Sequence, residues 1–390
     1  MASFLHIVPD DKFIDDAISF FSEIEGNHRW VSVKIDDNSL FSYIKNDIVE
    51  MASQKKIENI VSEGKYEAIV FHSLYATIYS LVLLVPKGKT IIWNSWGADI
   101  YYGIGCFPPL VKLDLYKHLT QKFLVEERPP LVKRIKRVLK NALHPSRIKE
   151  RRIHEKWIRD EREKCVALQH EVISRIDMCS TVLKTEFDEL KKIPGFNAVY
   201  FPFKYVNKEQ MIDQCHFEGD RILVGNSRDF SNNHLDVLDV LDRRNVINKR
   251  IVPLSYGLEK TVGVLRKKYN GNEKVELLTD YLDRATYWGI VRSCKAAVFG
   301  HIRQQALGNI NQCLLQGSKV FLYKDSMVYR FYKEVGAVVF SIEDDLCQQN
   351  IDKPLSTEDI DRNRAVVLDL WSYNKVIDQV KESLSFLMVG

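Results

Sequence analysis

Short apolar runs rich in β-branched residues alternate with segments of helical periodicity along almost the whole chain. This alternation predicts parallel β-sheets covered by helices, because a parallel strand is buried on both faces and needs a crossover helix to reach the next strand. The expected strands form two series. The first comprises Phe4–Val8, Trp30–Ile35, Ala68–His72, Thr90–Trp93, Asp177–Ser180 and Ala198–Phe201, and the second comprises Ile222–Gly225, Arg250–Pro253, Lys274–Leu278, Ala296–Phe299, Val320–Tyr323 and Val338–Ser341.

The two series predict an α/β protein with two Rossmann-like, doubly wound domains that face a cleft. Helices fit between the strands, for example His234–Asp242 after the possible caps Ser231 and Asn232, and Ala285–Arg292 after Asp283. The stretch 204–220 has no clear period and is the expected linker. We therefore expect domains at 1–203, with an insertion at about 107–164, and at 221–365, followed by a C-terminal helix at 366–390.

Composition excludes several classes of protein. A chain of 390 residues with 45% hydrophobic and 28% charged residues is neither disordered nor fibrous. No apolar run reaches membrane-spanning length, and the N-terminus has no basic segment typical of a signal peptide. Seven cysteines without a C-x-x-C pair argue against a disulfide framework and against a zinc site. These observations predict a cytoplasmic location.

A candidate anion site follows the strand Ala296–Phe299. Arg303, Gln304 and Gln305 lead through Gly308 and Asn309 into a helix, so a guanidinium, two amides and a glycine meet at a helix N-terminus. Free N–H groups and the helix dipole favour phosphate there, and arginine pairs with phosphate oxygens in a bidentate manner. A nucleotide diphosphate is the expected ligand; the alternative is an ordinary solvated loop at a helix start.

A second polar loop follows the strand Ile222–Gly225. Gly225, Asn226 and Ser227 can offer backbone and side-chain donors to phosphate at the next helix start. Such loops are also common helix caps. The expected position of this loop opposite residues 303–309 favours the phosphate interpretation.

The first domain carries a candidate sugar site at its strand ends. Trp93, Trp96 and Asp99 close the fourth strand, and indole faces with a nearby carboxylate suit a sugar. His72 ends the third strand in the same layer. The alternatives are a buried tryptophan pair with Asp99 capping a helix near Ile100, and a structural histidine.

Two Rossmann-like domains occur in several classes of protein. A dehydrogenase would need a G-x-G-x-x-G turn, and a periplasmic binding protein would need an export signal; the sequence shows neither. Nucleotide-sugar glycosyltransferases remain the best match to the pattern.

An ordered set of short motifs resembles the enterobacterial 4-acetamido-4,6-dideoxygalactose (Fuc4NAc) transferase family. The motifs are Trp-Gly-Ala-Asp at 96–99, Tyr-Phe-Pro at 200–202, Val-Gly-Asn-Ser at 224–227, Val-Pro at 252–253 with Tyr256-Gly257, and Arg-Gln-Gln at 303–305 with Gly308. The resemblance implies a GT-B fold, a dTDP-sugar donor held by the C-terminal domain, and a polyprenyl-diphosphate-linked (lipid II-type) acceptor held by the N-terminal domain. It implies no metal and no cofactor. The sole Asp-x-Asp, at 359–361, is better interpreted as the first turn of a helix.

The chain departs from that family pattern at 107–164, which includes a strongly basic stretch. Between Leu131 and Arg152 there are nine Lys or Arg residues and one acid, a net charge of +8 within a chain of +4. A cationic amphipathic helix at 131–143 would lie well on an anionic membrane, and the alternative is a helix docked on the protein's own core. No nucleic-acid-binding motif accompanies it. The expected membrane-binding residues are Lys133, Arg134, Lys136, Arg137 and Lys140.

The leading hypothesis is a metal-independent glycosyltransferase of surface polysaccharide synthesis, peripheral on the inner face of the cell membrane. Arg303 and residues 225–227 would neutralise the diphosphate leaving group, and the donor would be a dTDP-sugar, less readily a UDP-sugar. An inverting reaction needs a base such as Asp99 or His72, whereas in a retaining reaction the leaving phosphate can take the proton. The alternative is a non-catalytic nucleotide-sugar or lipid-glycan binding protein of the same fold. The expected donor-binding residues are Gly225, Asn226, Ser227, Tyr256, Arg303, Gln304, Gln305, Gly308 and Asn309.

Overall fold

The computed structural model describes residues 2–33, 40–126, 145–206 and 215–388, with residues 126, 145–158 and 388 described in backbone only. The chain forms two compact units. The first comprises Met1–Lys112, Ser146–Gln210 and Trp371–Gly390. The second comprises Leu113–Pro145 and Met211–Leu370. Each unit is therefore assembled from segments that are distant in sequence.

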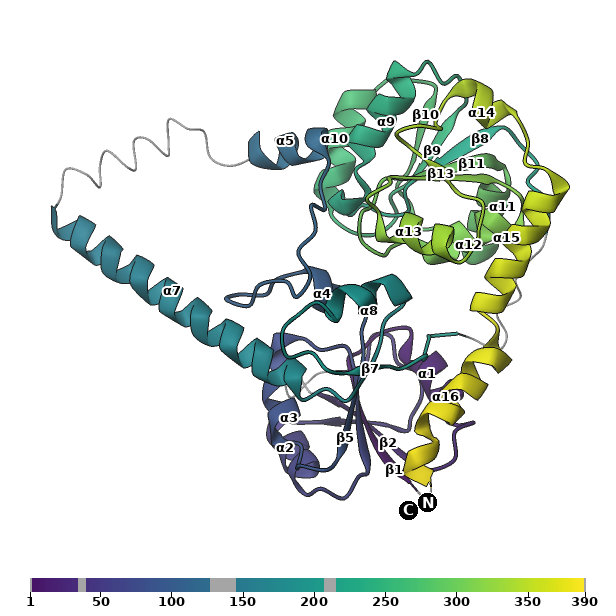
Figure 1. The fold of residues 1–390 in the computed structure, drawn as a ribbon. Helices are drawn as coiled ribbons and strands as arrows, with labels where there is room; N and C mark the ends of the chain where they lie inside the picture. Colours follow the sequence, from purple (N-terminus) through teal and green to yellow (C-terminus); the bar gives the residue numbers. More distant parts are fainter. Residues whose placement is uncertain (1, 34–39, 127–144, 207–214, 389–390) are drawn as a thin grey trace. The chain divides into compact units, whose positions relative to one another are not determined.

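The first unit is built on a parallel sheet, which has seven strands within the described residues (Figure 1). The strand order is β3-β2-β1-β4-β5-β6-β7, so the chain starts in the middle of the sheet and winds outward in both directions. The central strand β4 is buried at every position, as expected for a strand covered on both faces. The bounds are β1 Ser3–Val8, β2 Asn27–Val33, β3 Val49–Ala52, β4 Ala68–His72, β5 Thr90–Asn94, β6 Met178–Ser180 and β7 Val199–Tyr200.

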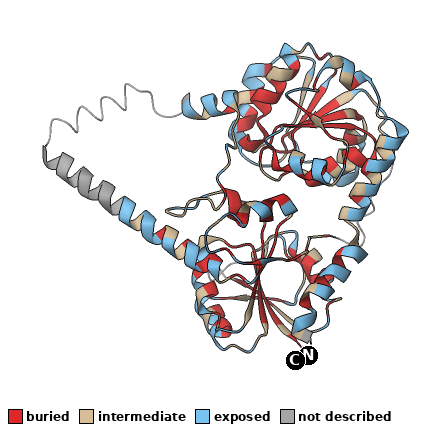
Figure 2. Ribbon diagram, viewed as in Figure 1, coloured by how far each residue is buried: buried red, intermediate tan, exposed pale blue. Residues whose placement is uncertain are grey.

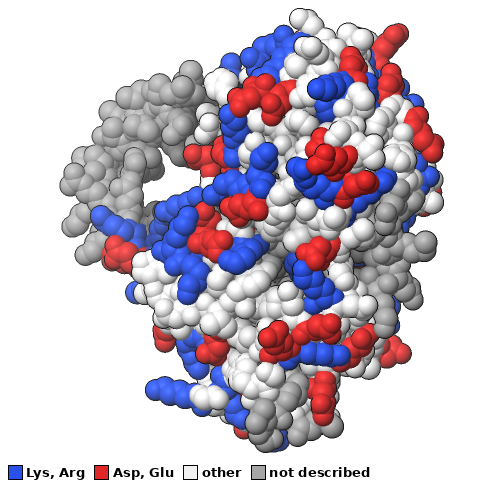
Figure 3. Space-filling model, turned by 45° about the vertical axis from the view of Figure 1, so that its right-hand side comes forward, with Lys and Arg blue, Asp and Glu red and all other residues white. Residues whose placement is uncertain are grey.

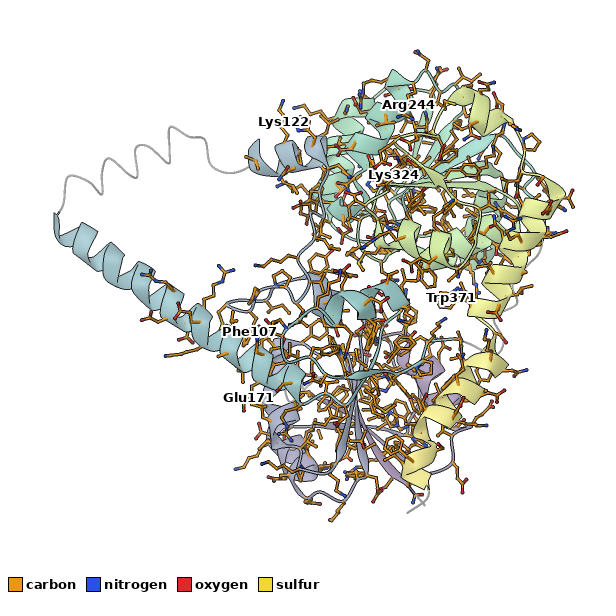
Figure 4. All side chains as sticks on the ribbon, in the orientation of Figure 1. Phe107, Lys122, Glu171, Arg244, Lys324 and Trp371 are labelled. Atoms are coloured by element: carbon orange, nitrogen blue, oxygen red, sulfur yellow. A yellow bond between two sulfur atoms is a disulfide. The ribbon has the colours of Figure 1, made fainter. Side chains whose placement is uncertain are left out.

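The helices of the first unit connect these strands and cover the sheet. The last helix, α16, is the most distant in sequence, yet its apolar face joins the core of this unit through Val376, Val380 and Leu384. At its start the ammonium of Lys204 lies 5.0 Å from the ring centre of Trp371 (Figure 4). The bounds are α1 Ile14–Phe21, α2 Gln54–Ser62, η1 Ala76–Ile78, α3 Tyr79–Leu84, α4 Ala98–Tyr101, α7 Pro145–Ser174, α8 Lys184–Leu190 and α16 Tyr373–Met388.

The second unit contains a parallel sheet of six strands in the described part of the chain. Its order is β10-β9-β8-β11-β12-β13, which places β8 and β11 side by side at the point where the winding reverses. Ligands of doubly wound sheets bind at that switch point. Figure 2 shows the strands of both sheets as the buried centre of each unit. The bounds are β8 Arg221–Val224, β9 Arg250–Pro253, β10 Val275–Leu278, β11 Cys294–Phe299, β12 Lys319–Leu322 and β13 Phe340–Ser341.

The second unit also includes α5, which precedes it in sequence by about a hundred residues. The carboxylate of Asp236 accepts hydrogen bonds from the backbone N–H groups of Leu119 (2.7 Å) and Thr120 (2.9 Å) and from the Thr120 hydroxyl (2.7 Å). These bonds hold the start of α5 against α9. The bounds are α5 His118–Glu126, η2 Phe230–Asn232, α9 His234–Arg243, α10 Glu259–Tyr269, α11 Arg284–Arg292, α12 Leu307–Leu315, α13 Met327–Glu334, α14 Gln348–Asp352 and α15 Thr357–Leu370.

The strand predictions agree with the structure in number and order except for β3, and the end of the expected strand Trp30–Ile35 lies outside the described residues. The strand β3 was missed because Val49-Glu50-Met51-Ala52 is a four-residue edge strand without an apolar run. The expected caps Ser231 and Asn232 of the helix at 234 were wrong. The residue before that helix is Asn233, in a left-handed conformation with φ 50°, and its side chain binds the carbonyl of Gly300 instead.

The unit boundaries differ from the expected domains at two places. The segment 113–126 belongs to the second unit because Asp236 anchors it there, and the helix expected at 366–390 is divided at Trp371, after which α16 packs on the first unit. Residues 207–214 of the expected linker are outside the described residues.

The prediction drawn from the cysteine count was wrong for one pair, since Cys106 and Cys165 form a disulfide. They are 59 residues apart, and local spacing gives no sign of the pairing. The disulfide forms because α7 packs against the segment that contains Phe107. The side-chain amide of Gln169, on α7, donates to the carbonyl of Pro108 over 3.1 Å. Figure 4 labels Phe107 and Glu171, the latter on α7. None of the helices in the described residues is both long and apolar enough to cross a bilayer.

Candidate functional site

The loops after β8 and β11 form one polar corner in the second unit. The two strands are neighbours in the sheet, so the loops that follow them leave the same edge. Gly225 begins the first loop with φ +67°, a left-handed conformation that glycine adopts without strain. Its backbone N–H donates to the carbonyl of Val298 over 3.0 Å. The backbone hydrogen bond between Gly225 and Val298 thus holds the start of the first loop against β11, the strand that precedes the second loop.

Side-chain amides join the two loops into one network. The Nε2 of Gln305 donates to Oδ1 of Asn226 (3.0 Å) and lies 3.4 Å from the Ser227 hydroxyl, while the hydroxyl of Ser231 donates to Oε1 of Gln305 (2.8 Å). The Nδ2 of Asn226 in turn donates to the phenol oxygen of Tyr256 over 2.9 Å. Four predicted donor-binding residues, Asn226, Ser227, Tyr256 and Gln305, are therefore in direct contact.

Arg303 lies beside this network and just before α12. Its guanidinium donates to the carbonyl of Gln304 (2.8 Å) and forms an ion pair with Asp229 (3.6 Å). The side chain is only 13% exposed, so the cation is held in place rather than extended into solvent. Asp229 itself is 36% exposed and keeps part of its carboxylate in water.

The N-terminus of α12 is open. Its first residues, Leu307 and Gly308, follow Ala306 in a left-handed conformation (φ 60°), and the side chain of Ala306 makes no capping hydrogen bond. Gly308 is exposed, and a Cβ built there would meet no atom within 4 Å. Asn309 is half-buried in the same turn. The N–H groups at the start of α12 carry partial positive charge, and Arg303 adds a full positive charge that Asp229 partly balances.

In the first unit, the loop after β5 is organised around Asp99. One carboxylate oxygen accepts from the backbone N–H of Leu74 (2.9 Å) and the indole N–H of Trp93 (2.8 Å), and the other accepts from the backbone N–H of Trp96 (3.0 Å). Asp99 is 6% exposed, and burial raises its pKa while the three N–H donors act in the opposite direction. The carboxylate therefore ties the ends of β4 and β5 together.

The two tryptophans of this corner differ in exposure. The Trp93 side chain is fully buried, whereas Trp96 is half-buried and packs edge-on against Tyr205, with ring centres 5.6 Å apart. Trp96 and Tyr205 thus both retain exposed surface, as does Tyr75, which interacts electrostatically with Asp99.

His72 is fully buried at the end of β4. Its Nδ1 lies 2.7 Å from the phenol oxygen of Tyr205, and its Nε2 lies 3.1 Å from Nδ1 of His6. Burial lowers the pKa of His72 to about 3. Its two ring nitrogens therefore contact the half-buried Tyr205 on one side and the buried His6 on the other.

A family model for 4-α-L-fucosyltransferases, glycosyltransferase group 56, matches residues 182–374. This is the family of the Fuc4NAc transferase that the sequence motifs resemble. The chain belongs to this glycosyltransferase family.

Solved glycosyltransferase structures share the fold of this group 56 chain. HepE of Anabaena in complex with UDP-glucose matches with a TM-score of 0.57 at 10% identity, covering 99% of this chain and 100% of the other. Sucrose-phosphate synthase of Thermosynechococcus elongatus matches with a TM-score of 0.56 at 7% identity, covering 100% of each. AviGT4, a glycosyltransferase involved in avilamycin A biosynthesis, matches with a TM-score of 0.52 at 9% identity, covering 100% and 99%. The group 56 chain therefore has the GT-B fold.

Two histidines of the donor corner were missed in the sequence. His234 and His301 are fully buried, and burial lowers their pKa values to about 4 and about 3. In each, Nε2 has no hydrogen-bond partner among the described atoms. A Cβ at Gly225 would come within 2.5 Å of Nε2 of His234, so this nitrogen lies directly against the loop after β8. His301 lies just beyond the end of β11, a position that the strand pattern could have marked, whereas His234 is the first residue of α9.

The predicted membrane-binding residues cannot be placed, because Lys133, Arg134, Lys136, Arg137 and Lys140 lie outside the described residues. On the face drawn in Figure 3, the acidic and basic side chains of the described residues are interleaved.

Proposed function

We propose that this group 56 glycosyltransferase moves a 4-acetamido-4,6-dideoxyhexose from a dTDP-sugar to a polyprenyl-diphosphate-linked glycan. The observation that carries the proposal is the corner formed by Arg303, the uncapped start of α12 and the amide network of Asn226 and Gln305. A diphosphate is the ligand that such a corner suits best. The dideoxyhexose, the dTDP donor and the lipid-linked acceptor come from the motif resemblance.

In this proposal the corner binds the donor and stabilises its leaving group. As the bond between the sugar and the diphosphate breaks, negative charge grows on the phosphate oxygens, and preorganised donors lower the barrier because they need no rearrangement. Arg303 supplies the positive charge, and the backbone N–H groups of Gly308 and Asn309 supply hydrogen bonds. The side-chain amide of Gln305 holds Asn226 and Ser227, and Tyr256, which accepts a hydrogen bond from Asn226, borders the same corner. The reaction then needs no metal ion.

The acceptor is proposed to bind at the strand ends of the first unit. Trp96 offers a half-buried indole face for sugar C–H surfaces, and Tyr205 offers a phenol oxygen beside it. Asp99 is a positioning residue in this scheme, because its two oxygens already accept three hydrogen bonds from the backbone and from Trp93.

The lipid anchor of the acceptor places the reaction at a membrane surface. The basic stretch at 131–143 is proposed to contact anionic lipid on the cytoplasmic face, where each Lys or Arg contributes about 1 kcal/mol. Disulfides rarely persist in the cytoplasm, so we expect Cys106 and Cys165 to be reduced there.

The experiment that separates a transferase from a non-catalytic binding protein measures dTDP release. Purified protein is incubated with dTDP-sugar, with and without a polyprenyl-diphosphate-linked glycan. We expect release of dTDP and extension of the glycan only when both substrates are present. Donor binding without any turnover on a panel of lipid-linked glycans would contradict the proposal and favour a binding protein.

A further inference from the structure

A chain of hydrogen-bonded rings crosses the sheet of the first unit. The phenol oxygen of Tyr205 lies 2.7 Å from Nδ1 of His72, Nε2 of His72 lies 3.1 Å from Nδ1 of His6, and Nε2 of His6 lies 2.9 Å from Nδ1 of His28. Nε2 of His28 lies 3.2 Å from the carbonyl oxygen of Ile24. We call Tyr205, His72, His6 and His28 the histidine relay. It runs from Tyr205 through the end of β4 and across β1 to the start of β2.

The carbonyl at one end fixes the direction of every hydrogen bond in the relay. The oxygen of Ile24 can only accept, so Nε2 of His28 carries a proton and, in the neutral ring, its Nδ1 is an acceptor. His6 must then donate from Nε2, and by the same argument His72 donates from Nε2 to His6. Tyr205 therefore donates its hydroxyl proton to Nδ1 of His72, and its oxygen keeps lone pairs for another donor.

The surroundings of the relay keep its inner rings neutral. Burial lowers the pKa of His72 to about 3, lowers that of His6 well below its ordinary value, and lowers that of the half-buried His28 as well. Aromatic side chains from neighbouring segments surround the rings, and the indole of Trp30 is stacked on His6 with ring centres 3.8 Å apart. Burial is the main cause that raises the pKa of the Tyr205 phenol; a side-chain hydrogen bond from Trp96 lowers it, and the carboxylates of Asp99 and Asp11 raise it further. The other flanking rings are Phe4, Phe21 and Phe203.

We propose that the relay is the base of the sugar transfer, with Tyr205 as the catalytic residue that contacts the acceptor hydroxyl and the three histidines as its proton store. This inference rests on the proposed function. It also assigns a role to His72 that differs from direct contact with the acceptor, since a fully buried imidazole acts only through the phenol.

The proton balance of this step is complete. The acceptor hydroxyl gives its proton to the oxygen of Tyr205, which passes its own proton to His72; His72 passes one to His6, and His6 passes one to Nδ1 of His28. The acceptor oxygen forms its bond to the sugar as the diphosphate leaves with the bonding electron pair. His28, the most exposed ring of the three, holds the positive charge until the product leaves. The reverse shift then returns the proton to water through Tyr205.

The sharpest test is His28→Gln. A glutamine at this position can accept from His6 with its oxygen and donate to Ile24 with its nitrogen, so it preserves both hydrogen bonds but cannot store a proton. A purely structural role predicts unchanged turnover. The relay predicts a fall in kcat of about 100-fold, typical of the loss of a general base, with unchanged binding of dTDP. His170→Gln, at an exposed position of α7, is the matched control.

A second measurement determines, without any substrate, which ring nitrogen of each relay histidine carries the proton. In protein labelled with ¹⁵N-histidine, at neutral pH, His6, His28 and His72 should each show a neutral ring protonated at Nε2. A ring protonated at Nδ1, or a charged ring, would overturn the relay whether or not the protein transfers sugar. Wild-type kcat in both His28→Gln and Tyr205→Phe would overturn its role as base and leave the transferase proposal intact. A wild-type protein that never transfers sugar would contradict the proposed function and the relay's role in it, while the ring protonation would still report on the hydrogen-bond chain.

Discussion

Gln305 donates its side-chain amide to Asn226 over 3.0 Å and thereby joins the loop after β11 to the loop after β8. The two residues are 79 positions apart in sequence, and Gln305 is only 8% exposed. This buried contact sets the spacing between the loops that form the donor corner. Arg303 and the start of α12 belong to the same loop as Gln305.

Removing this contact should weaken donor binding as well as the fold. Gln305→Ala leaves the side chains of Asn226 and Ser231 without their partner, and an unsatisfied buried polar group costs about 1–3 kcal/mol. We expect a lower free energy of unfolding by about that amount and a dTDP affinity reduced about tenfold. Calorimetric titration with dTDP measures the second effect. Gln54→Ala, at an exposed site of α2, is the control, and an unchanged dTDP affinity in Gln305→Ala would contradict the role of the network.

Asp99→Asn should affect stability more than turnover. The carboxylate accepts three hydrogen bonds with two oxygens, and an asparagine replaces one of these oxygens with an NH₂ group that faces a donor. We expect a loss of about 1–3 kcal/mol in unfolding free energy and a kcat within tenfold of the wild type. A folded Asp99→Asn protein that has lost 100-fold or more in kcat would instead make Asp99 the base.

Asp236 should control the attachment of α5. Its carboxylate binds two backbone N–H groups at the start of that helix, and loss of such a cap costs about 1–2 kcal/mol. In Asp236→Ala, hydrogen exchange in residues 118–126 should become faster, while exchange in the strands of the second unit stays slow. Asp239→Ala removes a surface ion pair of the same helix α9 and is the control. Equal protection of 118–126 in the Asp236→Ala and Asp239→Ala proteins would show that other contacts hold α5.

Buried neutral histidines should make the protein sensitive to acid. The folded pKa values of His72, His234 and His301 are about 3, 4 and 3, below the value of about 6.5 in an unfolded chain. Below pH 6.5 the unfolded chain therefore binds more protons than the folded protein does. The contribution of these histidines to the free energy of unfolding is thus present above pH 6.5 and is lost as the pH falls. Each such histidine contributes a loss of about 2 kcal/mol between pH 6.5 and 5.

Urea unfolding at several pH values tests this dependence. The free energy of unfolding should differ less between pH 6.5 and pH 5 in His301→Asn than in the wild type, by the contribution of one histidine. His170→Asn, at an exposed position, is the matched control. A wild-type stability that stays constant from pH 7 to pH 5 would contradict neutral burial of these rings.

The sequence predicted the strands and the contact between the loops after β8 and β11 because both depend on local patterns. Parallel strands end at one edge, so the polar residues after β8 and β11 were expected to meet, and Asn226 and Gln305 do. For the first unit, the sequence did not predict the hydrogen bonds that hold Asp99. These bonds come from Leu74 and Trp93 and depend on how the loops fold.

Features that arise from long-range packing were not predictable. His6 and His28 lie in or beside apolar strands, and only the pairing of β1 with β2 and β4 brings them into line with His72. The attachment of α5 depends on Asp236, more than a hundred residues away, and the bridge of Cys106 to Cys165 depends on how α7 packs. None of these contacts leaves a periodic signal in the sequence.

The most direct test of the account is the turnover of Arg303→Ala with a dTDP-sugar and a lipid-linked acceptor. Loss of a charge-assisted contact to a developing anion costs about 3 kcal/mol, so kcat should fall by about two orders of magnitude in a protein that remains folded. Arg243→Ala, which removes an exposed arginine of α9, should behave like the wild type. Wild-type turnover in Arg303→Ala would contradict the assignment of the diphosphate to the corner at the start of α12.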